Sequence, residues 1–212
     1  MANDHNEQLG VFGGTFDPVH LGHTQISRFV AEKINADKII LIPAKRSPLK
    51  RNNPIASDAD RVEMLKLATA DQRLFEISDC ELKRPLPSYT SQTVIQFRNR
   101  LGKDCSIFWL IGQDMLSDLS KWHKIDEILD NCEMLVMLRG GCEELDLPNL
   151  SETLGPRILA KIVKNVIYTP KMTISSSQIR ELICSGQPIT GLVCDGVADY
   201  IRENNLYLPG QA

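Results

Sequence analysis

Two glycines and two histidines lie close together in the segment Gly13-Gly14-Thr15-Phe16-Asp17-Pro18-Val19-His20-Leu21-Gly22-His23. Gly13 and Gly14 follow a short apolar run, and glycine lets the backbone turn sharply and approach a ligand closely. A helix that begins near His20 would aim its first N–H groups and the positive end of its dipole at the same place. His20 and His23 share one face of that first turn, and Gly22 leaves room for a ligand across it. The segment therefore predicts a phosphate-binding site.

Two other interpretations of this segment stay open. One is an ordinary strand-to-helix turn with two hydrogen-bonded histidines. The other is a metal site, although two histidines without a third ligand at suitable spacing disfavour it. The sequence lacks both the G-x-G-x-x-G dinucleotide fingerprint and the G-x-x-x-x-G-K-[ST] phosphate loop. Dehydrogenases and the usual phosphate-loop ATPases are therefore excluded.

A second candidate anion site lies near the other end of the sequence, in Ile174-Ser175-Ser176-Ser177-Gln178-Ile179-Arg180. Ser175 and Gln178 form an acceptable capping box, so the segment predicts the start of a helix. Three hydroxyls at a helix start, with Arg180 on the next turn, also form a cradle that can grip a polyphosphate by directed hydrogen bonds. Capping alone explains the serines but not the arginine.

The elements that must position these segments are short apolar runs alternating with amphipathic stretches, a pattern typical of βα units and a parallel sheet. Strands are predicted at Gly10–Gly13, Lys38–Ile42, Leu74–Ser78, Ser106–Ile111, Met134–Leu138 and Val166–Tyr168, and helices at residues 20–34, 57–70, 91–101, 175–184 and 197–203. We expect an α/β fold with a Rossmann-like doubly wound parallel sheet and flanking helices, forming a single domain over residues 1–212. Its C-terminal subregion, residues 170–212, would be small and helical.

Three stretches interrupt this alternation. Residues 44–56 and 83–89 each contain two prolines and follow predicted strands. Ligands of open parallel sheets bind at the carboxyl ends of strands, so these loops are the expected walls of a site. Residues 140–156 mix Gly, Glu and Pro, and we expect irregular surface chain there.

Composition and charge exclude several classes of protein. The hydrophobic fraction of 42% supports a sizeable core, and 24 basic against 27 acidic residues give a net charge of −3. That balance leaves no broad basic surface, so a nucleic-acid partner is not expected. Apolar runs are strand-sized, far below the roughly 18 residues of a membrane span. No membrane partner is therefore expected.

The cysteines and the N-terminus indicate a reducing compartment. The six cysteines form no C-x-x-C pair, and with four histidines they offer no zinc-site spacing. We expect them to be reduced and buried. The polar start MANDHNEQ lacks the plan of a signal peptide, so a cytoplasmic location is expected.

The histidine segment resembles the (H/T)-x-G-H signature of the nucleotidyltransferase superfamily. The fuller string GVFGGTFDPVHLGH is similar to that of bacterial nicotinate mononucleotide adenylyltransferases. The late serine segment resembles the I-S-S-T-x-I-R motif of the same superfamily, with Ser177 in place of Thr. The resemblance covers residues 10 to about 207 and is weakest over residues 140–164.

The residues between these motifs carry the resemblance to the substrate site. Ser88-Tyr89-Thr90 with Thr93 resembles the family's S-Y-T-x-x-T segment, and Ile111-Gly112-Gln113-Asp114 with Trp122 resembles its I-G-x-D…W segment. The resemblance implies that Trp122 stacks on the nicotinate ring and that the N–H groups of Thr90 and His123 hold its carboxylate. Asp114 would bind ribose hydroxyls, unless it serves as a helix N-cap, and Trp122 would otherwise be ordinary core.

The loop after the second strand and the end of the fifth strand complete the substrate site that the resemblance implies. The loop departs from the family's P-P-H-K or P-P-H-R, because Leu49 replaces the histidine while Lys50 keeps the cation for the substrate phosphate. Arg139 matches an arginine at the end of the fifth strand. The substrate-binding set is then Lys50, Ser88, Tyr89, Thr90, Trp122, His123 and Arg139.

The resemblance implies transfer of the adenylyl group of ATP to nicotinate mononucleotide, giving nicotinate adenine dinucleotide and pyrophosphate in NAD biosynthesis. Catalysis would fall to His20, His23 and Arg180. The ATP-binding set would be Gly13, Gly14, Thr15, Phe16, Gly22, Ile111, Gly112, Asp114, Ile174, Ser175, Ser176 and Ser177. Mg²⁺ would be bound with the ATP phosphates, without a dedicated protein cage.

Other functions remain alternatives to this one. The first is another adenylyl- or cytidylyltransferase of the superfamily, such as a phosphopantetheine adenylyltransferase. The second is a non-catalytic nucleotide-binding regulator that keeps the fold. The sequence leaves the oligomeric state open.

Overall fold

The computed structural model describes residues 6–46, 53–140 and 147–211. Six strands and eight helices follow one another in βα alternation over these residues. In chain order they are β1 (Gln8–Gly14), α1 (Leu21–Lys33), β2 (Lys38–Pro43), α2 (Asp58–Ala68), β3 (Phe75–Ile77), α3 (Thr90–Leu101), β4 (Ser106–Gly112), the 3-10 helix η1 (Gln113–Lys121), α4 (Ile125–Asn131), β5 (Glu133–Arg139), α5 (Leu147–Ile162), β6 (Val166–Thr169), α6 (Ser176–Cys184) and α7 (Asp195–Glu203).

One sheet contains all six strands, in the order β3-β2-β1-β4-β5-β6. This order is that of the doubly wound dinucleotide-binding folds. The pairs β1–β4, β4–β5 and β5–β6 are parallel, and Gln8, for example, lies opposite Ser106. The expected Rossmann-like parallel α/β fold is therefore confirmed, as are all six predicted strands.

The strand sequences explain where the core lies. In β2 the run Ile39 to Ile42 is at most 1% exposed, as expected for a parallel strand whose two faces are both covered. The edge strand β3 has only three residues, and its exposure pattern alternates. A short edge strand of this kind limits unwanted pairing with other chains.

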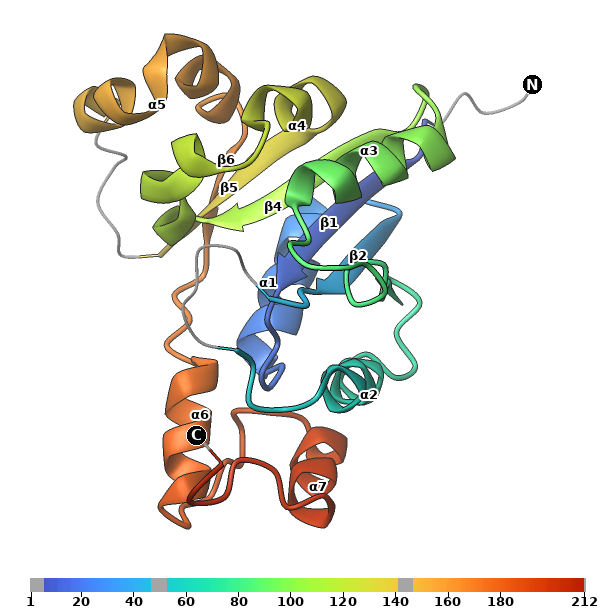
Figure 1. Cartoon of the computed structure of the whole chain (residues 1–212), viewed down its shortest axis with the longest axis vertical. Helices are drawn as coiled ribbons and strands as arrows, with labels where there is room; N and C mark the ends of the chain where they lie inside the picture. The colour runs from blue at the N-terminus through green and yellow to red at the C-terminus, as the bar shows by residue number, and fades with distance from the viewer. Residues whose placement is uncertain (1–5, 47–52, 141–146, 212) are drawn as a thin grey trace. The chain divides into compact units, whose positions relative to one another are not determined.

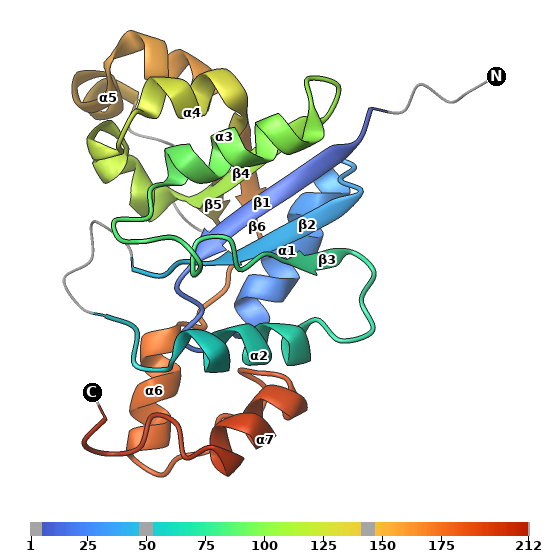
Figure 2. The ribbon, with the colours of Figure 1, turned by 45° about the vertical axis from the view of Figure 1, so that its right-hand side comes forward.

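The chain divides into two compact units, and each combines segments that are far apart in the sequence. Unit 1 comprises Met1–Phe12, Phe29–Ile40 and Tyr89–Lys171. Unit 2 comprises Gly13–Arg28, Leu41–Ser88 and Met172–Ala212. Within unit 1, α3 and α4 pack together and run along one face of the strands (Figure 1). Within unit 2, α2 and α7 lie side by side (Figure 2).

Local sequence signals account for several helix ends. Ser57 caps α2 in a capping box with Asp60, and Ser175 caps α6 by accepting a hydrogen bond from the Gln178 N–H. The five predicted helices are confirmed to within three residues at each end. The single-domain expectation for residues 1–212 stays a prediction.

The prediction of irregular chain over residues 140–156 is wrong where the structure describes it. Helix α5 occupies Leu147–Ile162, interrupted at Gly155, whose φ of 75° is not helical. A second helical segment begins at Pro156, since proline is tolerated in the first turn of a helix. The Gly-Pro pair that indicated a loop is a kink between two helical segments. Two further short helices, η1 and α4, were also not predicted.

The cysteine prediction is confirmed in part. The five described cysteines are all free thiols. Cys105 and Cys132 are buried, but Cys184 is exposed on α6, so burial was wrong there. Burial raises the pKa of the Cys132 thiol to about 12. In the described part of the chain, no helix combines the length and the apolar character that crossing a bilayer would demand.

Candidate functional site

The histidine segment occupies the turn from β1 to α1, within unit 2. His20 precedes the first residue of α1 and is 8% exposed, and its backbone N–H donates to Nδ1 of His23 at 3.2 Å. The two imidazoles stack with 3.6 Å between ring centroids, and Phe16 meets His23 edge-on at 5.0 Å. His23 is thus the third residue of the helix and accepts from the capping residue, as one half of a capping box does.

Gly22 is required by the position of His20. A Cβ atom at residue 22 would lie 2.9 Å from Nδ1 of His20 and 3.0 Å from its Cε1. Any other residue would push the imidazole aside. The predicted role of Gly22 in leaving room for a ligand stays a prediction. At Gly14, a Cβ would similarly meet the Phe16 ring at 3.0 Å.

The first N–H groups of α1 differ from what the sequence predicted. The sequence indicated that the first N–H groups of α1 face a ligand. Three of them already have partners, because His20 donates to His23 Nδ1, Leu21 donates to the Leu192 carbonyl and His23 donates to the His20 carbonyl. These three N–H groups are therefore not available to an anion.

The serine segment joins the histidine segment within unit 2. Ser176 Oγ donates to the Pro18 carbonyl at 2.9 Å, across 158 residues of sequence. Arg180 donates from Nη1 to the Asp17 carbonyl at 2.7 Å and from Nη2 to Ser177 Oγ at 3.3 Å. The two predicted anion sites are therefore parts of one cluster, which we call the phosphate cradle: residues 13–23 with residues 174–180.

The hydroxyls of the phosphate cradle are not equivalent. Ser175 Oγ accepts from the Gln178 N–H, and Ser177 Oγ accepts from Arg180, so both hydroxyls keep an O–H to donate. Both residues are exposed. The Ser176 hydroxyl donates its hydrogen bond to the Pro18 carbonyl and so holds the two segments together. Ile174 faces Gly22, 3.8 Å from where a Cβ would stand.

Arg61 is a residue of this region that sequence reasoning missed. Its side chain is fully buried, and Nη1 donates to the carbonyls of Thr15 and Ala44 at 2.7 and 2.8 Å. Nη2 forms an ion pair with Asp58 at 2.6 Å. Arg61 thus fixes the turn after β1 to the chain that follows β2. The Ala44 N–H makes a second link between them by donating to the Gly14 carbonyl.

The aromatic part of the predicted substrate site lies in unit 1. Tyr89 stacks on His123 with 4.1 Å between ring centroids, and Ser91 Oγ lies 3.1 Å from His123 Nδ1. Trp122 ends η1, and its Nε1 is buried without a hydrogen-bond partner among the described residues. Thr90 is the first residue of α3, where an N–H has no partner inside the helix.

Asp114 and Ile111 lie at the carboxyl end of β4, also in unit 1. Asp114 is exposed in the first turn of η1, and its carboxylate lies over Gly112 where any Cβ would collide with it. Gly112, not Asp114, is the N-cap of η1, so the capping alternative for Asp114 is wrong. Ile111 is buried.

The remaining predicted residues are placed as follows. Ser88 belongs to unit 2, is buried, and its Oγ has no hydrogen-bond partner in the described chain. Arg139 ends β5, with its backbone opposite Thr169 of β6. Lys50 and Leu49 lie outside the described residues.

The sequence of this chain is similar to those of a known family of proteins. The family model for cytidylyltransferase-like proteins matches residues 11–182. A Klebsiella pneumoniae protein named "Probable nicotinate-nucleotide adenylyltransferase" is 37% identical, covering 96% of this chain and 99% of its own. Another of that name from Dehalococcoides mccartyi (strain CBDB1) is 35% identical, covering 94% and 97%.

Solved structures agree on the fold. Plasmodium falciparum nicotinic acid mononucleotide adenylyltransferase complexed with NaAD superposes with a TM-score of 0.70 at 18% identity, covering 95% of this chain and 97% of that one. A putative nicotinate-nucleotide adenylyltransferase from Vibrio parahaemolyticus gives 0.62 at 19%, covering 97% and 98%. With curated relatives above 30% identity over nearly its whole length, the chain belongs to the nicotinate-nucleotide adenylyltransferase family of nucleotidyltransferases.

Proposed function

We propose that this chain transfers the adenylyl group of ATP to the phosphate of nicotinate mononucleotide, releasing nicotinate adenine dinucleotide and pyrophosphate. The observation that carries the proposal is the phosphate cradle. Hydrogen bonds from Ser176 and Arg180 to the Pro18 and Asp17 carbonyls bring two phosphate-binding motifs together within one compact unit. The names of the relatives supply the substrate class.

The chemistry explains why the cradle needs no catalytic base. A mononucleotide phosphate is already an anionic nucleophile at neutral pH, so catalysis consists of alignment and stabilisation of charge. His23 has Nδ1 occupied as an acceptor, so its neutral form carries the proton on Nε2. That N–H would donate to oxygens of the α-phosphate, where negative charge develops.

The leaving pyrophosphate has its own partners in the cradle. Arg180 supplies a positive charge, and Ser175 and Ser177 keep O–H groups to donate. As pyrophosphate departs, its charge rises and these interactions strengthen. Gly13, Gly14, Thr15 and Phe16 would shape the turn beneath the phosphates, with the Thr15 carbonyl held by Arg61.

ATP enters the proposed reaction as its magnesium complex, with Mg²⁺ bound by phosphate oxygens and water. The donor set of the cradle fits this form of the substrate, because imidazole, hydroxyl and guanidinium groups bind phosphate oxygens. Among the described residues, no group of three His, Cys, Asp or Glu side chains could hold an ion. In the proposed function the ion enters and leaves with the nucleotide.

The nicotinate end would bind in unit 1. A flat pyridinium ring suits the face of Trp122, and a carboxylate suits the N–H groups of Thr90 and His123. Asp114 would accept hydrogen bonds from ribose hydroxyls. Arg139 and Lys50 would meet the substrate phosphate.

The cytoplasm is the proposed location, since the described cysteines are free thiols.

The experiment that tests this function is pyrophosphate release from magnesium-ATP, with nicotinate mononucleotide, nicotinamide mononucleotide and 4′-phosphopantetheine offered separately. We expect strong release with nicotinate mononucleotide. Release with phosphopantetheine alone would keep the reaction type and overturn the substrate. Silence with all three, from a folded protein, would overturn the proposed function.

A further inference from the structure

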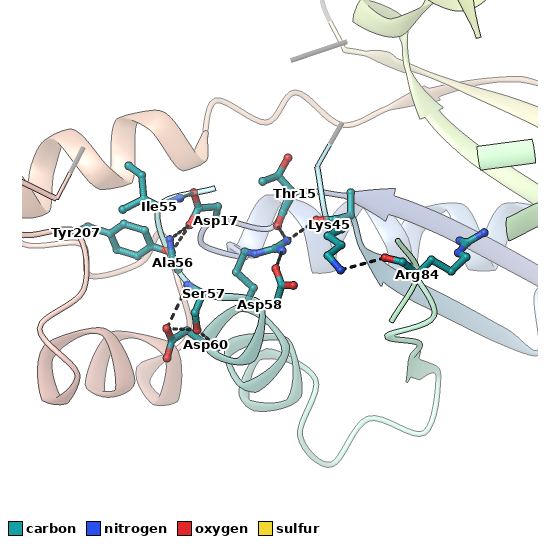
Figure 3. Close-up of polar contacts among 12 residues, drawn as sticks. Thr15, Asp17, Lys45, Ile55, Ala56, Ser57, Asp58, Asp60, Arg84 and Tyr207 are labelled. Atoms are coloured by element: carbon teal, nitrogen blue, oxygen red, sulfur yellow. Dashed lines mark hydrogen bonds and ion pairs between the residues drawn. The ribbon is translucent and has the colours of Figure 1, made fainter. Parts of the chain in front are cut away.

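The carboxylate of Asp17 is a buried meeting point of three segments of unit 2. Its side chain accepts hydrogen bonds from the N–H groups of Ile55 and Ala56 at 2.8 and 3.0 Å. It also accepts one from the hydroxyl of Tyr207 at 2.8 Å (Figure 3). Asp17 is 4% exposed and Tyr207 3%. Buried polar oxygens of this kind need hydrogen-bond partners, and these three supply them.

The main chain of the same residue holds the cation of the phosphate cradle. The Asp17 carbonyl accepts from Arg180 Nη1 at 2.7 Å, and the next carbonyl, of Pro18, accepts from Ser176. The position of these two carbonyls depends on how residue 17 is oriented. The three hydrogen bonds to its carboxylate fix that orientation.

Tyr207, which makes this bond, has an unusual backbone conformation. Its φ of 64° lies in the left-handed region that side chains other than glycine avoid. Such a conformation persists where surrounding contacts determine it, and it is common at functional sites. Burial, followed by the nearby Asp17 carboxylate, raises the pKa of the Tyr207 phenol, which keeps the hydroxyl protonated as a donor.

We propose that Tyr207 and Asp17 are positioning residues of the phosphate cradle: the Tyr207 hydroxyl orients Asp17, whose carbonyl aims Arg180 at the departing pyrophosphate. The inference rests on the proposed function for the role of Arg180. It assigns to the end of the chain, 190 residues away from Asp17, a part in turnover. The competing explanation is that Tyr207 merely anchors the C-terminal turn.

Unit 2 contains a matched pair that separates these explanations. The Tyr200 hydroxyl donates to Asp60 Oδ1 at 2.9 Å, so it is also a tyrosine bonded to a carboxylate. That bond joins α7 to the start of α2 and involves no residue of the cradle. Tyr200→Phe therefore also removes a tyrosine hydroxyl and its hydrogen bond to a carboxylate. It does so at a place that has no contact with Arg180 through this bond.

The test compares Tyr207→Phe and Tyr200→Phe in the full chain, by adenylyl-transfer kinetics and by calorimetric binding of pyrophosphate. For Tyr207→Phe we expect a roughly tenfold lower kcat and a similar loss of pyrophosphate affinity, the size of one hydrogen bond to a charged group. The KM for nicotinate mononucleotide should stay within about twofold, because the residues proposed to bind its ring, such as Trp122, belong to unit 1. Tyr200→Phe should leave all three values near those of the unaltered protein.

Equal kinetics and pyrophosphate binding in the two variants would overturn the inference and leave Tyr207 as an anchor. Asp17→Ala supplies a second test, because it removes both oxygens that accept from the two N–H groups and from the hydroxyl. Adding Tyr207→Phe to Asp17→Ala should then cost much less than Tyr207→Phe alone, and full multiplication of the two effects would also contradict the proposal. Pyrophosphate binding needs no turnover, so these outcomes are distinct from failure of the proposed function.

Discussion

The backbone N–H of His20 donates to Nδ1 of His23. This one bond caps the start of α1 and also leaves Nε2 as the protonated nitrogen of the neutral His23 ring. His23 therefore has two separable roles. Through Nδ1 it caps the helix, and in the proposed function its Nε2–H would donate to the phosphates. Replacements that mimic one nitrogen or the other can separate helix stability from turnover.

His23→Asn retains an acceptor near the position of Nδ1 but no donor at Nε2. We expect this variant to lose kcat by on the order of 10²- to 10³-fold, the usual effect of removing one charge-stabilising donor. Its melting temperature should remain close to that of the unaltered chain. His23→Ala should lose the same activity and, in addition, about 1 kcal/mol of stability, as expected for a lost cap. Near-normal turnover by a folded His23→Asn would remove His23 from the reaction.

Trp122 should report nicotinate binding directly. The chain has two tryptophans, and Trp109 is a buried core residue of β4. In Trp109→Phe the emission comes from Trp122 alone, and we expect nicotinate mononucleotide to change it saturably. In Trp122→Phe the emission comes from Trp109, and we expect no change. Titrations with ATP as well as with the mononucleotide check whether the two ligands bind separately.

In kinetics, Trp122→Ala should raise the KM for nicotinate mononucleotide by roughly tenfold or more, since a ring–cation contact is lost. The KM for ATP should be little changed. A collapse of ATP affinity instead would mean that Trp122 serves the packing of η1 and not the substrate.

Arg61 should be among the residues most important for the stability of unit 2. Arg61→Ala leaves the carbonyls of Thr15 and Ala44 without their donor in a buried place. We expect a loss of about 3 kcal/mol or more from the lost bonds and the cavity together. Urea unfolding measures it. Lysine keeps the charge but not the planar fork, so Arg61→Lys should also destabilise, by less.

The control for Arg61 is Arg202→Ala. Arg202 pairs with Asp199 at 2.7 Å on the surface of α7, and its side chain is 74% exposed. Exposed pairs of this kind contribute little, so we expect a change below about 0.5 kcal/mol. Equal losses in the two variants would contradict the role given to Arg61.

Strands and helix caps depend on short stretches of sequence and could be predicted from them. The strands were predictable because apolar runs such as Ile39–Ile42 must be covered on both faces, and the cap at Ser57 was predictable from its spacing to Asp60. Helix α5 was missed because the Gly155-Pro156 pair, a common loop signal, here marks a kink inside the helix.

The candidate site could be predicted as a set of motifs, but the hydrogen bonds that join the motifs could not. The bonds from Ser176 to Pro18 and from Tyr207 to Asp17 span 158 and 190 residues, and no periodicity encodes such contacts. Arg61 was missed for a related reason. In sequence it is one charged residue of a polar helix, and only the fold shows that its fully buried guanidinium binds carbonyls of two separate segments.

The thiols should differ sharply in reactivity. Cys184 is exposed on α6, whereas Cys132 is buried with a pKa raised to about 12. The thiolate is the reactive form, so at pH 7.5 a maleimide should modify Cys184 quickly and leave Cys132 unmodified until urea unfolds the chain. Peptide mass spectrometry after timed quenching measures both. Rapid native labelling of Cys132 would show that β5 and α4 open far more readily than their packing indicates.

The Tyr207 phenol should make stability depend on alkaline pH. Its pKa is raised above the ordinary value of 10.0, first by burial and then by Asp17. A folded-state pKa above the unfolded value means that this stabilisation is complete below about pH 10 and is lost as pH rises further. Between pH 8 and 10.5, the advantage of the unaltered chain over Tyr207→Phe should shrink by roughly 1 kcal/mol in urea unfolding. All other titrating groups are shared by the two proteins and cancel in the difference. A constant difference across this range would mean that the Tyr207 hydroxyl titrates as it does in water, and that the buried bond to Asp17 does not hold its proton.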